Sequence, residues 1–135
     1  MAVRIARALL DGLIEQAGGA PGREICGLLF GTGTGIDRAE PADNVADRPQ
    51  DTFEIDPRAL FAALRAERGG GPRLIGHYHS HPNGRAEPSP RDLAAAEPGK
   101  YWLIIGGGVA RLWLAEPDGF TEVKMIVNHD RASGG

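Results

Sequence analysis

The sequence contains a single cysteine, Cys26, so an intrachain disulfide is excluded and a reducing compartment, the cytoplasm, is expected. No apolar run approaches the ~20 residues that a membrane-spanning helix requires. The segment from Met1 to Leu10 lacks the long apolar stretch and the small-residue cleavage site of a secretory signal. The formal net charge is -3, which argues against nucleic acid as the main partner. These absences favour a cytoplasmic protein that acts neither on nucleic acid nor in a membrane.

The length and composition are those of one globular domain. The chain has 135 residues, enough for one hydrophobic core, and 41% of them are hydrophobic. Twenty glycines and ten prolines predict short elements separated by frequent turns. We expect the domain to cover residues 1–127 and the polar segment 128–135, which ends in Gly134 and Gly135, to be a flexible tail.

Hydrophobic periodicity predicts alternating helices and strands. Helices are expected over 3–17, from Asp56-Pro57 to the glycines at 69–71, and from Ser89 to about Glu97. Asp56 suits the N-cap of the second helix, and Pro57 suits its first turn. Strands are expected at 24–30, near 37–40, and at 52–55, 73–79, 101–105, 109–115 and 120–127, with a hairpin turn at 31–35. This order predicts an α/β or α+β sandwich with a mixed sheet.

Candidate metal ligands are concentrated in one stretch, Gly76-His-Tyr-His-Ser-His-Pro82, which is followed by Ser89-Pro-Arg-Asp92. Side chains alternate along a strand, so His77, His79 and His81 are expected to share one face. Asp92 lies eleven residues after His81, near the start of the next helix, and a loop of that length can return its carboxylate to the histidines. Two histidines and one carboxylate would hold zinc and leave a fourth position for water.

Each part of this pattern also has a simpler interpretation. Ser89 and Asp92 form a near capping-box pattern, with proline in the first turn, and would serve a helix N-terminus without any metal. Histidines in strands are often only hydrogen-bonded. Three of the four histidines, however, fall within five residues just before a proline-containing turn, and a single metal site explains them together with Ser89 and Asp92.

The sequence contains His79-x-His81, then ten residues and then Asp92, with Ser89 three residues before the aspartate. This pattern resembles the metal motif of the JAMM (MPN-plus) metalloprotease family. The segment Glu24-Ile-Cys-Gly-Leu-Leu-Phe-Gly31 resembles the first strand of that family, and Phe53-Glu-Ile-Asp-Pro57 resembles the segment before its central helix. The resemblance runs from about residue 3 to about residue 127. It implies a cytidine-deaminase-like three-layer α/β arrangement, with a mixed central β-sheet flanked by helices.

The resemblance also implies roles for single residues. His79, His81 and Asp92 match the zinc ligands, Glu24 the general base and Ser89 the hydroxyl that assists the oxyanion. From the sequence alone, Glu24 would be read as a solvated acid at the start of a strand. His77 departs from the family, which usually has an aromatic residue there, and Cys26 is more simply a packed small hydrophobe. Asn44 resembles a recurrent asparagine with a structural or substrate-positioning role.

The resemblance implies a substrate class as well. Members of the family hydrolyse the bond after the Gly-Gly end of ubiquitin or ubiquitin-like proteins. Only the segment from Leu93 to Lys100 separates Asp92 from the next strand, which leaves no room for the second insertion of the eukaryotic deubiquitinases. The chain is similar to compact prokaryotic members, so the expected partner is a ubiquitin-like sulfur-carrier protein or its conjugates.

Two rival classes follow from the same residues. A non-catalytic MPN-type protein-binding scaffold would share the fold but would not hold stoichiometric zinc. Other zinc hydrolases fit less well: one cysteine cannot supply the Pro-Cys-x-x-Cys of a deaminase, no His-Glu-x-x-His occurs, and the chain is shorter than a metal-dependent barrel.

Overall fold

A computed structural model describes residues 2–129, and its strands form one mixed sheet that closes on itself. The strand order is β1-β3-β2-β4-β5-β6-β7, and β7 returns to pair with β1. The β1–β3, β1–β7 and β4–β5 pairs are parallel, whereas the other neighbours are antiparallel. The elements are β1 (Ala2–Ala6), α1 (Arg7–Gly18), β2 (Cys26–Thr32), β3 (Gly35–Ala42), α2 (Pro57–Arg68), β4 (Leu74–Ser80), α3 (Pro90–Ala95), β5 (Tyr101–Gly106), β6 (Val109–Glu116) and β7 (Gly119–Asn128).

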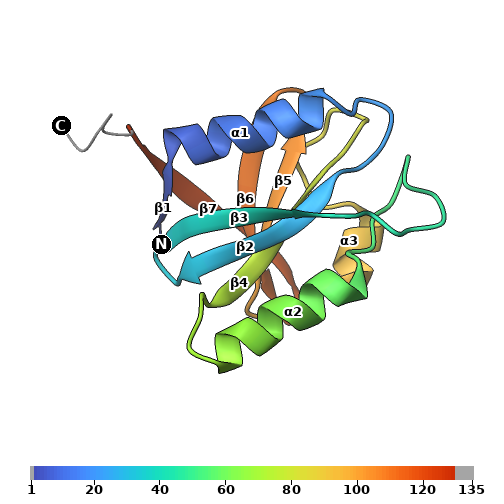
Figure 1. Ribbon diagram of the computed structural model, residues 1–135. Coiled ribbons are helices and arrows are strands. Elements are labelled where there is room, and N and C mark those ends of the chain that lie inside the picture. Colours follow the sequence, from blue (N-terminus) through green and yellow to red (C-terminus); the bar gives the residue numbers. More distant parts are fainter. Residues whose placement is uncertain (1, 130–135) are drawn as a thin grey trace.

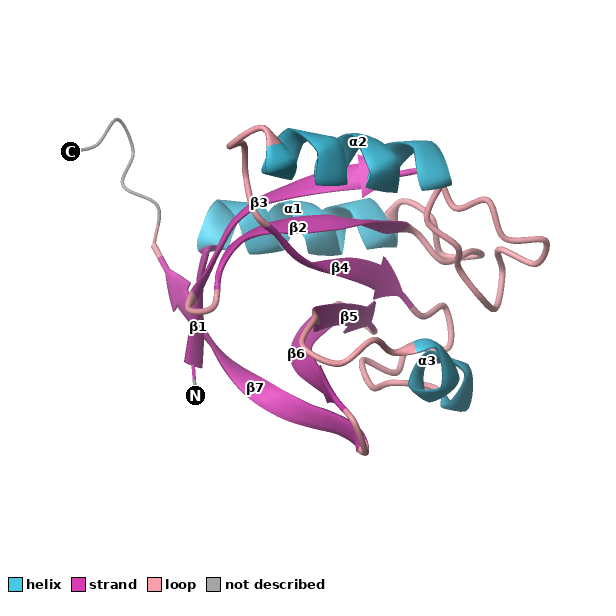
Figure 2. Cartoon of the chain, turned by 90° about the horizontal axis from the view of Figure 1, so that it is seen from below, coloured by secondary structure: helices cyan, strands magenta, loops and turns pink. Residues whose placement is uncertain are grey.

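The predicted mixed sheet with flanking helices is confirmed. Helices α1 and α2 lie on opposite sides of the sheet, and the short helix α3 lies near one end of it (Figure 1). Asp56 caps α2 as expected, because its Oδ1 accepts a hydrogen bond of 3.0 Å from the Arg58 amide. Closure of the sheet, visible from below in Figure 2, was not predicted, since it depends on pairing between the two ends of the chain.

The helix predicted over 3–17 is wrong in its first part, because residues 2–6 form strand β1. Val3 and Ile5 are almost fully buried, and both belong to the core beneath α1. Pairing with β7 on one edge and with β3 on the other overrides the helical spacing of the apolar residues. The helix itself begins only at Arg7.

The strand predicted at 52–55 is also wrong, because only Ile55 forms a bridge, to Asn44. The side chain of Asn44 takes the place of a continuous backbone ladder. Its Oδ1 accepts a hydrogen bond from the Glu54 amide and its Nδ2 donates to the Thr52 carbonyl, both at 3.0 Å. A local side chain thus competes with sheet pairing for backbone groups, and the segment stays irregular.

Two apolar clusters stabilise the fold. The larger lies between α1 and the sheet and includes Leu13, Leu29, Tyr78 and Leu103. Gly27 makes room for the Tyr78 ring, because a Cβ there would come within 2.3 Å of it. The smaller cluster lies under α2 and consists of Leu28, Phe30, Ala63 and Leu74 with their partly buried neighbours.

The predicted tail, 128–135, begins with the last residue of β7, Asn128. Residues 130–135, which include Gly134 and Gly135, lie outside the described part of the chain. Within residues 2–129, no helix has the length and apolar character needed to cross a membrane.

Candidate metal centre

The candidate ligands come together where β2 begins and β4 ends, next to the first turn of α3. His79 lies in β4, pairs with Cys26 of β2, and is followed by His81 just beyond the strand. The start of β2 is fastened to the end of β4 by two hydrogen bonds: the Ser80 amide donates to the Ile25 carbonyl at 3.0 Å, and the Ile25 amide donates to Ser80 Oγ at 2.9 Å. Glu24, directly before Ile25, therefore lies beside the two histidines.

The two imidazoles and the Asp92 carboxylate converge at close range. His79 Nε2 and His81 Nε2 are 3.0 Å apart, and Asp92 Oδ2 lies 3.3 Å from the first and 3.2 Å from the second. All three side chains are buried. The sequence predicted that a loop would return Asp92 to the histidines, and in the structure its carboxylate lies beside both imidazoles.

Asp92 also caps helix α3, so the two interpretations of this residue are not alternatives. The Ser89 amide donates to Asp92 Oδ2 at 2.9 Å, and the Asp92 amide donates to Ser89 Oγ at 3.1 Å, which completes a capping box. The same Oδ2 thus accepts from the helix terminus and faces both imidazoles. Burial raises the pKa of Asp92, but the close contacts with His79 and His81 outweigh burial and hold the pKa well below its usual range.

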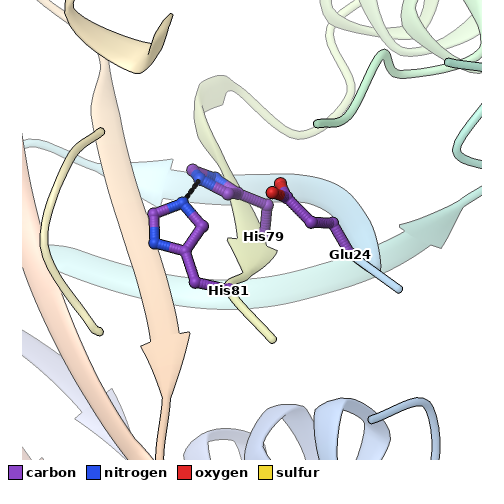
Figure 3. A group of neighbouring side chains, drawn as sticks. All are labelled: Glu24, His79 and His81. Atoms are coloured by element: carbon purple, nitrogen blue, oxygen red, sulfur yellow. Dashed lines mark hydrogen bonds between the residues drawn. The ribbon is translucent and has the colours of Figure 1, made fainter. Parts of the chain in front are cut away.

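Glu24 is the second carboxylate of the site. Its carboxyl group turns toward the imidazoles (Figure 3), and ligand atoms of Glu24, His79 and His81 lie within 4.8 Å of one another. Burial raises the pKa of Glu24 from 4.5 to about 7, with Asp92 raising it further and His81 lowering it. Its backbone is held on both sides, because the Glu24 amide donates to the Pro49 carbonyl at 2.7 Å and Asn44 Nδ2 donates to the Glu24 carbonyl at 2.9 Å.

The electrostatic surroundings of the two imidazoles differ. Burial lowers the pKa of His79, which keeps this ring neutral, the form that binds metals. Burial also lowers the pKa of His81, but Asp92, the Arg85 carbonyl and Glu24 outweigh it and the net pKa is raised. His81 Nδ1 lies 2.8 Å from the Arg85 carbonyl oxygen, and because a carbonyl only accepts, Nδ1 carries the proton and Nε2 points toward His79 and Asp92.

The donor set fits a metal ion. Two ligands of a tetrahedral cation with bonds of ~2.0–2.1 Å lie about 3.3 Å apart, close to the three separations among His79, His81 and Asp92. Two facing Nε2 atoms and a carboxylate oxygen form a negative, nitrogen- and oxygen-rich group in a buried setting. His79 and His81 are therefore a buried candidate metal site, with Glu24 and Asp92 as the neighbouring carboxylates.

Three other residues singled out from the sequence are placed as follows. Ser89 Oγ accepts from the Asp92 amide, which leaves its hydroxyl hydrogen available for donation. His77 shares the face of His79 but packs against Trp102, with ring centroids 4.3 Å apart. Cys26 is fully buried, as expected of a packed small side chain, its thiol faces the Ala42 and Asp43 carbonyls, and burial raises its pKa to about 12.

Sequence reasoning missed two contacts. Phe53 stacks on the His79 ring at a centroid distance of 4.2 Å and an interplanar angle of 20°. The alternation at 52–55 marked Phe53 only as a strand residue, and its contact with His79 depends on the tertiary fold. The Arg85 carbonyl was missed because it acts through the backbone, which the residue type does not reveal.

Comparison with known proteins gives one matching family, two related proteins and one similar solved structure. The model of the family described as prokaryotic homologues of the JAB domain matches residues 6–117. The desampylase of Haloferax volcanii is 34% identical over 126 residues, which cover 89% of each chain. The probable TtuB-protein conjugate cleaving protease of Thermus thermophilus is 39% identical over 92 residues, 68% of this chain and 61% of that protein. A solution structure of a protein from Desulfitobacterium hafniense superimposes with a TM-score of 0.81 at 29% identity, covering 96% of this chain and 94% of that one.

Proposed function

The chain belongs to the family of prokaryotic homologues of the JAB domain, and from that premise we propose that it is a zinc-dependent isopeptidase that releases ubiquitin-like proteins from their conjugates. The observation that carries the proposal is the group of two facing Nε2 atoms with Asp92 Oδ2, beside the carboxyl group of Glu24. The similar proteins point to the substrate class, because one is a desampylase and another a probable protease of TtuB conjugates. The scissile bond is the one after a C-terminal Gly-Gly.

We assign the zinc ligands as His79, His81 and Asp92. A zinc ion held by these donors supplies a Lewis acid that makes water nucleophilic near neutral pH. Two imidazoles and one carboxylate match the three-ligand sets of catalytic zinc sites, which keep a fourth position open. The capping box of α3 holds the Asp92 carboxylate in place for this task.

Glu24 is assigned as the general base and, later, the general acid. Its pKa of about 7 suits a group that takes a proton from water and passes it to the leaving amine at neutral pH. The Ser89 hydroxyl is assigned to the oxyanion, toward which its hydrogen is free to point while its oxygen accepts from the Asp92 amide. The reducing setting that we propose, the cytoplasm, suits a chain whose only cysteine is a buried thiol.

A cleavage assay tests this function. The substrate is a ubiquitin-like sulfur carrier extended beyond its Gly-Gly end, or joined there to a lysine, and several carriers are compared. We expect zinc-dependent release that Glu24→Ala reduces by about 10²–10⁴-fold while zinc stays bound. Glu15→Ala, which removes an exposed glutamate of α1, is the matched control and should leave the rate unchanged.

Metal analysis separates the enzyme from the scaffold. An enzyme purifies with, or takes up, one zinc per chain, whereas a scaffold of the same fold does not. Absence of zinc-dependent cleavage across all carriers would contradict the isopeptidase, and full activity in Glu24→Ala would remove Glu24 as the base.

A further inference from the structure

The two imidazoles of the site are held in different ways. His81 has a hydrogen bond on the ring nitrogen that faces away from the site, from Nδ1 to the Arg85 carbonyl at 2.8 Å. Metal-binding histidines usually have such a bond, because it fixes the tautomer and the plane of the ring. His79 has none: its Nδ1 is buried and without a hydrogen-bond partner among residues 2–129.

Aromatic packing surrounds His79 instead. The Phe53 ring lies nearly parallel to the imidazole, at 4.2 Å and 20°. Trp102 meets the same imidazole edge-on, at 5.5 Å and 83°. Stacked and edge-to-face contacts of this kind have preferred geometries, so they define the plane of a ring even where no hydrogen bond does.

We infer that Phe53 is the positioning residue for His79: its stacked ring fixes the imidazole plane and keeps Nε2 directed at the metal, as the Arg85 carbonyl does for His81. The inference rests on the proposed function, since it concerns the zinc ligands of that same site. In this role Phe53 acts through His79, on whose ring it stacks.

Phe53 can perform this role because its own backbone is fixed. Asn44 donates to the Thr52 carbonyl and accepts from the Glu54 amide, both at 3.0 Å, so it holds the residues on either side of Phe53. The same Asn44 Nδ2 donates to the Glu24 carbonyl at 2.9 Å. One amide side chain therefore ties the segment that carries Phe53 to the residue that carries the base.

Loss of the stacked ring would free the imidazole of His79 to rotate. Changes to the outer groups that hold metal-bound histidines typically weaken metal binding by about 10–100-fold, and we expect Phe53→Ala to weaken zinc affinity by at least about 10-fold. Phe53→Leu fills much of the volume without a flat face and should fall in between. Phe53→Tyr retains the flat face and should bind zinc as the wild type does.

The experiment measures zinc affinity by competition with a chromophoric chelator, together with the visible absorption spectrum of the cobalt-substituted protein. The spectrum reports ligand geometry, which a purely structural role would leave unchanged once the protein is folded. Thermal unfolding of the metal-free variants checks folding. Phe61→Ala is the matched control, because it removes a ring that is 63% exposed on α2. If Phe53→Ala does not fold, the zinc affinities and cobalt spectra of Phe53→Leu and Phe53→Tyr are compared instead.

The outcomes separate this inference from the proposed function. Weaker zinc binding and an altered cobalt spectrum in Phe53→Ala and Phe53→Leu, with neither in Phe53→Tyr or Phe61→Ala, support the role of the flat ring. If Phe53→Ala has the zinc affinity and cobalt spectrum of the wild type, the inference is overturned; where Phe53→Ala does not fold, the same result in Phe53→Leu overturns it. The proposed function still stands in that case, provided that the wild type binds zinc and is active. A wild type that binds no stoichiometric zinc contradicts the proposed function itself.

Discussion

The two faces of the sheet at β4 and β5 differ in how completely their buried polar atoms are hydrogen-bonded. Toward α1, the Tyr78 hydroxyl donates to Gln16 Oε1 at 3.0 Å. On the opposite face, three buried nitrogens have no hydrogen-bond partner within residues 2–129: His77 Nδ1, His79 Nδ1 and Trp102 Nε1. The rings of His77, His79 and Trp102 lie next to one another and to the Phe53 ring.

This contrast separates the region that stabilises the fold from the region that performs the chemistry. An unsatisfied buried polar group costs about 1–3 kcal/mol, so the face with the candidate metal site reduces the stability of the metal-free protein. The α1 face combines the larger apolar cluster with the hydrogen-bonded Tyr78 hydroxyl, and burial of this cluster offsets that cost. Departures from full polar satisfaction are expected at functional sites.

The largest effect on stability is expected from the α1 face. Leu103 is fully buried in the larger cluster. Leu103→Ala should reduce the free energy of unfolding by about 2–5 kcal/mol, because it removes buried methyl groups and leaves a cavity. Urea denaturation measures this change, and chelator competition on the folded protein should give wild-type zinc affinity. A marked loss of zinc affinity would show that the two faces are coupled.

Glu24→Gln should stabilise the metal-free protein at alkaline pH. The folded-state pKa of Glu24, about 7, lies above its ordinary value of 4.5, so the folded state favours the protonated form. As pH rises from 4.5 to about 7, ionisation of Glu24 therefore progressively lowers the free energy of unfolding. Glutamine does not ionise, so the variant does not lose this stability.

We expect the two metal-free proteins to be similarly stable near the lower end of that window, and the variant to be more stable above it by on the order of 1–3 kcal/mol. Urea denaturation at a series of pH values, after removal of metal by a chelator, measures the difference. A difference that does not grow with pH would contradict the assignment of the raised pKa to Glu24.

Asn44→Ala should affect both stability and activity. The substitution removes four hydrogen bonds, two donated to the Glu24 and Thr52 carbonyls and two accepted from the Ala46 and Glu54 amides. We expect a loss of about 1–3 kcal/mol in the free energy of unfolding and a lower kcat/KM.

Asn44→Asp is the control for that substitution. It retains the acceptor for the two amides but places a second carboxylate oxygen against the Glu24 and Thr52 carbonyls. Restored activity in this variant would show that the two donated bonds are dispensable.

The smallest effects are expected at two neighbouring residues of β4. Tyr78→Phe should destabilise the protein by about 0.5–1.5 kcal/mol, because Gln16 loses its partner. His77→Phe should be neutral or slightly stabilising, because it removes an unpartnered Nδ1 from an aromatic environment. Urea denaturation of both variants gives the comparison, and a larger loss in His77→Phe than in Tyr78→Phe would contradict the contrast between the faces.

Much of the site could be predicted because its geometry is local. Alternation along β4 places His77 and His79 on one face, and the capping pattern of Ser89 and Asp92 fixes the start of α3. The strand at residues 2–6 could not be predicted in this way, because its identity depends on pairing with β7 at the other end of the chain. The irregular conformation of residues 52–55 could not be predicted for a related reason. The Asn44 side chain, rather than a continuous backbone ladder, bonds to this segment.

The sequence by itself determined which residues can bind a metal and how they are spaced, since periodicity and helix capping are properties of a few neighbouring residues. Only the tertiary structure decided that Glu24 is buried with a raised pKa, that Asp92 Oδ2 serves the helix and both imidazoles, and that Phe53 stacks on His79. Burial, charge proximity and ring stacking arise between segments that are distant along the chain, so no local pattern encodes them.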